Sequence, residues 1–474
     1  MKILKIFIVL LGAFFALHTN AVNKNNQKQK DKPRIVVLTD IAPGDIEPDD
    51  MESMVRLLVH ADLFEIEALI ATSGWNSSGR DYPKTWMDYL QVCLNAYEKD
   101  LPNLMKRSKQ TSFLPLEEEG KCQKIGYWPS IDYLRSRTML GCPRLGFARI
   151  GGDNDSAGSD YIIRLLQEED DRPLWVLAWG GANTLAQAIW KMKQQYNDNE
   201  WKAMLKKLCL YTITDQDVGW GERNNHFLSS HYWMRKECGK SLRFIWDESA
   251  WLTQNEIGSK NWDKYAEHIQ GHGHLGGIYP KNKWGVEGDT PSFLHVMPTG
   301  LNVPSVFDHI GWGGFFQWGV SADGETSCYT NIDPEVKSIS RKYEEYFYPA
   351  TFNNFAARMD WAKEGRGNRN PIVCISKSKQ SEVIYLSVGA GKKVVLDASK
   401  SYDPDGDDLQ YKWWILPEAG TYKKSVIVEN ADTNKAIVNV PVDMGKETIH
   451  LILEVTDMGT PSLTAYRRMV ITTR

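Results

Sequence analysis

Short apolar runs alternate with amphipathic segments along the first half of the chain. Continuous apolar runs predict four buried strands, at residues 35–38, 66–71, 174–178 and 208–213. Helical periodicity predicts helices at residues 50–60, 85–96, 161–167 and 184–195. Apolar strands separated by helices indicate an α/β fold with a mostly parallel sheet that is covered on both faces. Residues 103–149 show neither pattern, and we expect irregular loops there that shape the rim of a site.

The pattern changes near residues 365–371, which are rich in Gly, Arg and Asn. Short alternating runs follow, at residues 394–396, 410–414, 425–428, 436–440, 449–455 and 469–472. Turn signals such as Asp403-Pro404-Asp405-Gly406 separate them. This spacing predicts a β-sandwich. We therefore expect one domain over residues 33–369 and a second over residues 370–474.

The N-terminus has the pattern of a targeting segment. Lys2 and Lys5 flank its start, residues 6–17 are apolar, and Thr19-Asn20-Ala21 offers small residues for cleavage. We expect a signal peptide over residues 1–21, cleaved near Ala21, and a flexible leader over residues 22–32. The mature protein is then exported to the periplasm or outside the cell. No later segment is apolar enough for membrane insertion.

Composition narrows the function classes. A formal net charge of -4 over 474 residues, without a basic stripe, argues against a nucleic-acid partner. The chain has seven cysteines and no C-x-x-C spacing, so most are expected to be buried thiols. It also has 18 tryptophans, which either stack on sugar rings or belong to the core. Five of them fall in loop-like segments near the motifs below: Trp75, Trp179, Trp220, Trp284 and Trp312.

The first predicted strand runs directly into an acid-rich turn. Its carboxylates are those of Asp40, Asp45, Glu47, Asp49 and Asp50. They follow the carboxyl end of a strand, where open α/β sheets bind ligands. Helix capping by Asp49 and Glu52 would explain those two residues but not the others. Like charges this close are costly without a cation, so the turn predicts a hard-metal site and, through it, a hydrolase.

Three further segments carry candidate chemistry near predicted strand ends or helix starts. Gly180-Gly181 follows the third strand, and Asp215 and Asp217 follow the fourth. His272 and His274 stand between glycines, and Asp289 precedes Thr290-Pro291. Ordinary turns and a cap at Asp289 explain these residues equally well in isolation.

In combination, these motifs resemble a known family. The segment from Asp40 to Asp49-Asp50 resembles an expanded form of the nucleoside hydrolase signature D-x-D-P-G-x-D-D. With residues 175–181, 214–217 and 287–293, it is similar to the nucleoside hydrolase-like branch that includes bacterial proteins labelled cellulose-binding. Residues 397–407 resemble the immunoglobulin-like domain that often follows. The resemblance implies a Rossmann-like, mostly parallel sheet of the nucleoside hydrolase type and a C-terminal immunoglobulin-like β-sandwich.

The resemblance also implies a ligand set. Asp40, Asp50 and Asp289 would bind Ca²⁺ through carboxylates, and Trp179 through its main-chain carbonyl. Asp49 would bind sugar hydroxyls and take part in catalysis. Water activated by the metal and Asp40 would attack an anomeric carbon. Further substrate contacts are expected from the side chains of Asn183, Asp215 and Asp217.

Two departures from the family pattern concern catalysis. Residues inserted after Asp40 allow Asp45 or Glu47 to replace or add a ligand. Gly288 stands where nucleoside hydrolases often have a histidine that assists the leaving group. Glu287, His272 or His274 would then supply the acid, or the leaving group needs none.

We therefore expect an exported, Ca²⁺-dependent hydrolase of N- or O-glycosidic bonds that acts in carbohydrate utilisation. The alternative is a catalytically weak or inactive carbohydrate-binding protein on the same fold. A carbohydrate or glycoside is the expected partner, and a homo-oligomer is compatible with the sequence.

Overall fold

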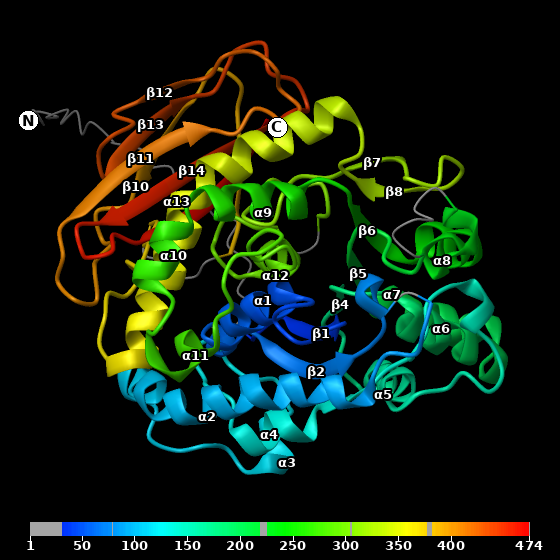
Figure 1. Cartoon of the computed structure of the whole chain (residues 1–474). Helices are drawn as coiled ribbons and strands as arrows, with labels where there is room; N and C mark the ends of the chain where they lie inside the picture. Colours follow the sequence, from blue (N-terminus) through cyan, green and yellow to red (C-terminus); the bar gives the residue numbers. More distant parts are fainter. Residues whose placement is uncertain (1–30, 78, 219–224, 304–305, 377–381, 474) are drawn as a thin grey trace, which may run out of the picture.

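The structure is a computed structural model that describes residues 31–77, 79–218, 225–303, 306–376 and 382–473 (Figure 1). The predicted signal peptide, nearly all of the leader and Trp220 lie outside the described residues. The main body contains an eight-stranded sheet in the order β3-β2-β1-β4-β5-β6-β8-β7. Its strands are β1 Arg34–Thr39, β2 Glu65–Ala71, β3 Thr138–Leu140, β4 Leu174–Ala178, β5 Leu208–Ile213, β6 Arg243–Asp247, β7 Gln317–Val320 and β8 Ser327–Thr330. Neighbouring strands are parallel except β7 and β8, which confirms the predicted α/β class.

The strand order reverses between β1 and β4. Both strands point the same way, with Arg34 opposite Leu174 and Leu38 opposite Ala178. The loop after β1 leads toward one half of the sheet and the loop after β4 toward the other. Open α/β sheets bind ligands at such a switch point. The acid-rich turn and Gly180-Gly181 are the two loops that leave this point.

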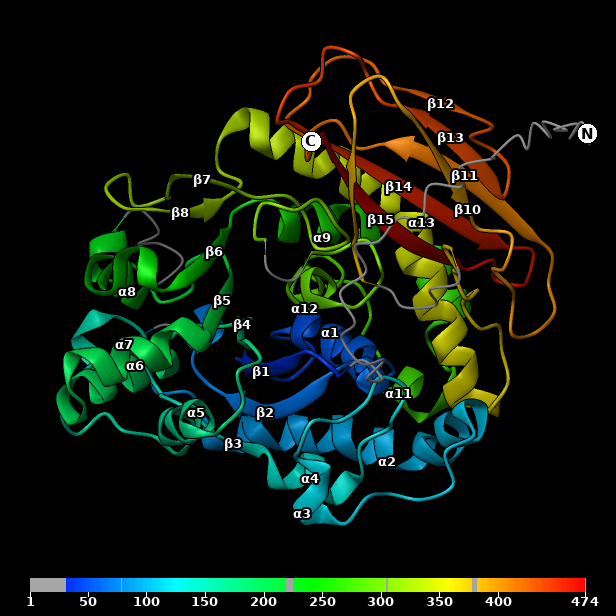
Figure 2. The ribbon, with the colours of Figure 1, turned by 180° about the vertical axis from the view of Figure 1, so that it is seen from behind.

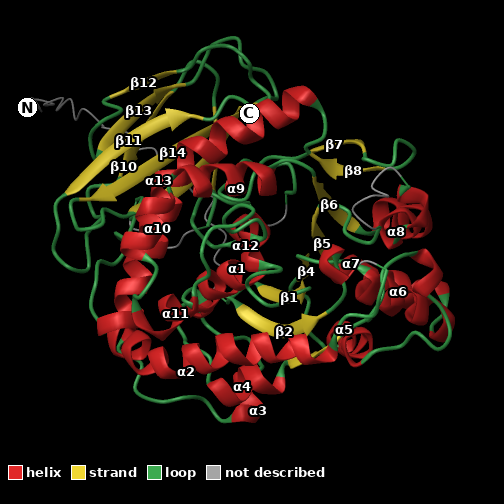
Figure 3. Ribbon diagram, in the orientation of Figure 1, coloured by secondary structure: helices red, strands yellow, loops and turns green. Residues whose placement is uncertain are grey.

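Helices cover both faces of the sheet (Figures 1 and 3). Side chains of β1 alternate between two cores: Ile35 and Val37 enter one, Val36 and Leu38 the other. The first core is completed by α1 Pro48–Leu58, α2 Asp88–Ser108, α9 Ala250–Lys260, α10 Trp262–His268, α11 Gly273–Ile278, α12 Thr290–Val296 and α13 Pro334–Glu364. The second is completed by α5 Ala157–Gln167, α6 Asn183–Gln195, α7 Asp198–Lys207 and α8 Ser230–Cys238.

The prediction of an irregular stretch over residues 103–149 is wrong in part. Helix α2 continues to Ser108 although Pro102 lies inside it, and short elements follow: α3 Leu116–Glu119, α4 Ile131–Ser136 and β3. The sequence pattern missed β3 because it has three residues that are all only half-buried.

The C-terminal segment forms two facing sheets (Figure 2). One has the order β10-β13-β12 and the other β11-β14-β15-β9. The strands are β9 Ile384–Val388, β10 Lys393–Asp397, β11 Leu409–Ile415, β12 Ile427–Glu429, β13 Lys435–Asn439, β14 Thr448–Asp457 and β15 Thr464–Thr473. They enclose a core of their own. This confirms the sandwich-like arrangement, and β9 is the one strand here that the sequence pattern missed.

Helix α13 lies against both parts of the chain (Figures 1 and 2). The Tyr346 hydroxyl donates to Glu454 at 2.9 Å, and the ring of Tyr343 stacks on Trp414 with centroids 6.2 Å apart. On β15, the amide of Arg468 donates to the carbonyl of Gly300 at 3.1 Å. Tyr466 of β15 also belongs to the first core of the α/β sheet. The sandwich is therefore packed firmly onto the α/β body, on the side away from β3.

Two smaller expectations concern the membrane and the cysteines. Among the described residues, no helix has the length and apolarity needed to cross a membrane. Six of the seven cysteines are buried, as expected, and Cys122 is exposed.

Candidate active site

The acid-rich turn folds tightly between β1 and α1. The carbonyl of Pro43 accepts hydrogen bonds from the amides of Ile46 at 2.7 Å and Glu47 at 3.0 Å. Helix α1 then begins at Pro48, with Glu47 as N-cap residue but without a capping bond from its side chain. Asp49 and Asp50 occupy the first turn, where a helix dipole favours negative charge. The capping-box alternative for Asp49 is therefore wrong.

The carboxylate of Asp40 is fully buried between two glycines. A Cβ on Gly74 would lie 1.8 Å from its Oδ2, and a Cβ on Gly180 would lie 2.6 Å from its Oδ1. Only residues without side chains allow Asp40 to occupy this space. Neither carboxylate oxygen has a hydrogen-bond partner among the described residues. A buried carboxylate without partners is costly, so the site is built for a ligand that supplies them.

Two more buried carboxylates converge on Asp40. Asp50 is 2% exposed and accepts a hydrogen bond from the Thr39 hydroxyl at Oδ1. Asp289 is also 2% exposed and is the N-cap residue of α12, but its side chain makes no capping bond and its Oδ2 has no partner among the described residues. On the solvent side, oxygens of Glu47, Asp49 and Asp50 lie within 4.8 Å of one another. We call these residues the acidic cluster: Asp40, Glu47, Asp49, Asp50 and Asp289.

The acidic cluster is electrostatically strained. Burial and the charge of Asp49 raise the pKa of Asp40 to about 7. Burial and the neighbouring aspartates likewise raise the pKa values of Asp50 and Asp289 well above their usual range. Among the described residues, no basic side chain forms an ion pair with any member of the cluster. A bound cation would remove this strain directly.

The donor set fits a hard cation. The cluster offers only oxygen ligands, several of them without partners, which is the chemistry that Ca²⁺ or Mg²⁺ prefers. Trp179, whose carbonyl is expected to be a ligand, is held nearby: its amide donates to Leu38 O at 2.8 Å. Its carbonyl accepts a hydrogen bond from the side-chain amide of Gln216, and a second lone pair stays available. Gln216 is a neighbour of the site that the sequence analysis did not single out.

Of the three candidate acids, His274 is exposed on α11, and Glu287 and His272 lie in different surroundings. Glu287 is fully buried, and its carboxylate pairs with Arg56 at 2.5 Å. Its amide donates to Glu52 at 2.7 Å, and its φ of 62° is unusual for a residue with a side chain. These bonds fix the loop that carries Asp289. His272 contacts Asp360 of α13 at 3.0 Å, so the structure does not bring it to the acidic cluster.

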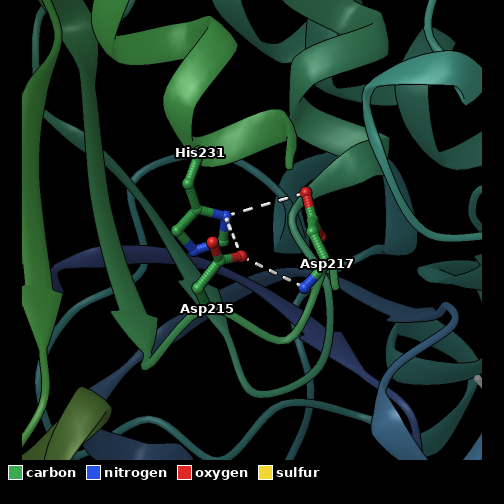
Figure 4. Close-up of side chains that lie close together, drawn as sticks. All are labelled: Asp215, Asp217 and His231. Atoms are coloured by element: carbon green, nitrogen blue, oxygen red, sulfur yellow. Dashed lines mark hydrogen bonds and ion pairs between the residues drawn. The ribbon is translucent and has the colours of Figure 1, made fainter. Parts of the chain in front are cut away.

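Asp215 and Asp217 form a separate cluster with His231 of α8 (Figure 4). Nδ1 of His231 lies 3.2 Å from Asp215 Oδ1 and 3.6 Å from Asp217 Oδ2, and its Nε2 donates to Thr214 O at 3.2 Å. Both ring nitrogens face acceptors, which is the arrangement of a charged imidazolium. We call these three residues the ion-pair cluster.

The pKa values agree with that charge state. Burial alone would lower the pKa of His231, but Asp215 and Asp217 raise it to about 9. Asp217 also accepts the amides of Ala182 at 2.6 Å and Ser230 at 2.9 Å. Its oxygens are thus used in joining the loops after β4 and β5 to α8. That Asp215 and Asp217 contact the substrate stays a prediction, and the geometry favours a structural role for both residues.

Asn183 is also engaged by the protein itself. Its side chain donates to Gly146 O at 2.7 Å and accepts from Gly146 N at 3.0 Å. This pair of bonds fixes the loop before α5 against α6. The prediction that Asn183 contacts substrate has no support from a free polar atom.

Comparison with protein families agrees with this geometry. The family model described as "Cellulose-binding Sde182, nucleoside hydrolase-like domain" matches residues 34–316, which is more than half of the chain. The chain belongs to this family. A second model, "Cellulose-binding protein Sde0182, C-terminal domain", matches residues 393–473. The two matches correspond to the α/β body and to most of the sandwich.

Solved structures show the same relationship. A nucleoside hydrolase-related hypothetical protein from Saccharophagus degradans, described as associated with carbohydrate metabolism, is 34% identical with a TM-score of 0.77. The match covers 94% of this chain and all of that one. A PKD domain solved in solution is 21% identical over 19% of this chain and 80% of its own, with a TM-score of 0.15. No curated protein matches the chain. The nucleoside hydrolase-like fold of this Sde182 family member is thus confirmed.

Proposed function

We propose that this protein is a Ca²⁺-dependent hydrolase of glycosidic bonds in carbohydrates. The single observation that supports this most strongly is the acidic cluster, with the fully buried and unpartnered carboxylate of Asp40 at the switch point of the sheet. The family description and the carbohydrate association of the Saccharophagus degradans relative favour a sugar substrate.

Four residues of the cluster have roles in this proposal. Asp40, Asp50, Asp289 and the Trp179 carbonyl would hold the cation, which would neutralise the carboxylates and lower the pKa of water at the site. Asp40 accepts the proton of the attacking water at one of its two free oxygens. Asp49, which is half-buried, binds sugar hydroxyls from the solvent side. The sugar then reacts through an oxocarbenium-like state, which the carboxylates stabilise.

The catalytic step that the acidic cluster does not account for is protonation of the leaving group. Glu287 is paired with Arg56, His272 is paired with Asp360, and His274 is exposed on α11, so each candidate acid is engaged or placed away from the cluster. This observation favours the second candidate function, a carbohydrate-binding protein with little or no catalysis. Substrates whose leaving groups need no proton distinguish the hydrolase from the carbohydrate-binding protein.

The test is a release assay for reducing sugar with cation-depleted mature protein. The panel contains inosine, cello-oligosaccharides and 4-nitrophenyl glycosides, each with and without added Ca²⁺. We expect Ca²⁺-dependent release, greatest with the nitrophenyl glycosides, and a loss of about 100-fold or more in Asp40→Asn. Asp198→Asn is the control, because it removes an exposed charge on α7, outside the acidic cluster.

Bound calcium without release from any substrate would reject the hydrolase in favour of the binding protein. We also propose that the protein is exported, on the basis of the pattern in residues 1–21. N-terminal sequencing of the mature protein tests this, and an intact Met1 would contradict it.

A further inference from the structure

Helix α9 places two half-buried side chains beside the acidic cluster, Trp251 and Asn255. Asp247, at the end of β6, accepts the amides of Ser249 at 2.9 Å and Ala250 at 2.7 Å, and so fixes where α9 starts. Trp251 and Asn255 are four residues apart and therefore lie on one face of the helix. This face meets Trp75, in the loop after β2, and Gly288, in the loop before α12.

Asn255 converges with Asp49. A Cβ on Gly288 would lie 2.7 Å from Asp49 Oδ2 and 2.9 Å from Asn255 Nδ2. The carboxylate and the amide thus approach the same point, and the absent side chain at Gly288 keeps that point open. A carboxylate beside a side-chain amide can bind two neighbouring hydroxyl groups. The carboxylate accepts hydrogen bonds, and the amide both donates and accepts them.

Trp251 pairs with Trp75 from the loop after β2. The two rings meet edge to face, with centroids 6.3 Å apart and planes at 63°. Trp75 follows Gly74, which packs on the Asp40 carboxylate, and its Nε1 donates to Val218 O at 2.8 Å. Both tryptophans are only half-buried. The pair therefore holds an aromatic surface in a fixed orientation close to the acidic cluster.

Several polar atoms around this surface are unsatisfied. Trp251 Nε1, Asn255 Oδ1 and Asn76 Oδ1 have no hydrogen-bond partner among the described residues. Such an atom is costly when it is shielded from water without a hydrogen-bond partner. A ligand rich in hydroxyl groups would supply the missing partners.

A third tryptophan lies on the loop that precedes Asp289. Trp284 is 71% exposed. Lys283 holds it near the acid-rich turn: Nζ lies 4.8 Å from the Trp284 ring centroid and donates to Asp45 O. The loop over residues 280–288 thus runs beside the acid-rich turn, from Gly44 to Asp49.

We propose that Trp75, Trp251 and Asn255 form a recognition face for a β-linked oligosaccharide, with Trp284 as a second stacking position. This inference deepens the proposed function and rests on it. Equatorial pyranose rings have a flat C–H surface that packs on indole and vicinal hydroxyls that match Asp49 with Asn255. Two tryptophan positions suit a chain of several sugars better than a nucleoside, which is a single sugar with a base.

The test is calorimetric titration of the calcium-loaded mature protein with cellotetraose, cellobiose and inosine. We expect Trp251→Ala to weaken cellotetraose binding about 10-fold through lost stacking, and Asn255→Ala about 5-fold through lost hydrogen bonds. Trp284→Ala should weaken cellotetraose but not cellobiose. Trp318→Ala is the matched control, because Trp318 is 40% exposed but lines a separate pocket with Arg243, the first residue of β6.

The outcomes separate this inference from the proposed function. Unchanged cellotetraose binding in both Trp251→Ala and Asn255→Ala would overturn the recognition face. A loss of cellotetraose binding that is accompanied by a loss of Ca²⁺ affinity or of thermal stability would also overturn it, because the role of the substituted residue would then be structural. Binding of inosine in place of cellotetraose would overturn the oligosaccharide but leave a glycosidic substrate. No binding of any of the three would overturn the recognition face, and the release assay with 4-nitrophenyl glycosides would then decide the proposed function separately.

Discussion

The acidic cluster follows the carboxyl end of β1 and the ion-pair cluster that of β5, with β4 between the two strands, and both clusters bury aspartates. In the ion-pair cluster, His231 and the amides of Ala182 and Ser230 satisfy the carboxylates. In the acidic cluster, Asp40 has no partner for either oxygen among the described residues. The protein thus supplies the counter-charge in one place and leaves it to a ligand in the other.

Whether the protein itself supplies partners for a buried carboxylate distinguishes structural from functional carboxylates better than residue type does. Asp217 and Asp40 are both fully buried aspartates that follow a strand and pack against a glycine, Gly181 and Gly180 respectively. Burial raises the pKa of Asp217, and the charge of His231 counteracts this rise. Burial also raises the pKa of Asp40, and there the charge of Asp49 raises the pKa further. A buried carboxylate without a counter-charge is costly, so it persists where it serves binding or catalysis.

The largest effect should come from removing one carboxylate of the acidic cluster. We expect Asp50→Asn to weaken Ca²⁺ binding on the order of 100-fold or more, because affinity depends on the number of charged ligands. Terbium luminescence and calorimetry measure this without reference to activity. Asp217→Asn is the control and should keep Ca²⁺ affinity within a few-fold. Equal losses in the two variants would erase the distinction between the clusters.

The ion-pair cluster should instead contribute stability. The pKa of His231 is raised from 6.5 to about 9, so its stabilisation is complete below pH 6.5 and disappears as the pH rises through about 9. This corresponds to about 3 kcal/mol. Urea unfolding should therefore show His231→Gln to be less stable than the wild type by about that amount at pH 6, with a smaller difference at pH 10. A difference that does not depend on pH would contradict a charged His231.

The sequence was sufficient for the parts of this comparison that follow from local pattern. Apolar runs located β1, β2, β4 and β5, and the acid-rich turn brought Asp40 and Asp50 together as neighbouring carboxylates. It was not sufficient to show that Asp215 and Asp217, expected as substrate contacts, pair with a histidine, because their partner His231 comes from α8. Trp251 and Asn255 were missed for a similar reason: on α9 they look like ordinary surface residues until Gly288 and Trp75 are placed beside them.

The cation-free protein should lose stability as its carboxyls ionise. The pKa of Asp40 is raised from 3.8 to about 7, so the folded state holds a proton that the unfolded state releases. Stability then falls as pH rises from about 4 to 7, by at most about 4 kcal/mol for this group. Thermal unfolding with chelator should show this fall, and saturating Ca²⁺ should remove it. Identical profiles with and without Ca²⁺ would contradict a cation at the cluster.

The smallest effect concerns the residues inserted after Asp40. Glu47 is half-buried at the solvent side of the cluster, with an oxygen within 4.8 Å of those of Asp49 and Asp50. We expect Glu47→Gln to weaken Ca²⁺ binding by about 3- to 10-fold, through one lost charge at the edge of the site. Asp45→Asn, at an exposed neighbouring position, is the matched control and should have no effect. Equal effects of the two substitutions would assign Glu47 a general electrostatic role only.

The most direct measurement is a calorimetric titration of Ca²⁺ into chelator-treated mature protein, in parallel with Asp50→Asn and Asp217→Asn. The account predicts one tightly bound ion in the wild type and in Asp217→Asn, and none in Asp50→Asn under the same conditions. A wild type that binds no Ca²⁺, or a site that is lost with Asp217 and kept without Asp50, would contradict the central claim that the acidic cluster is the metal centre.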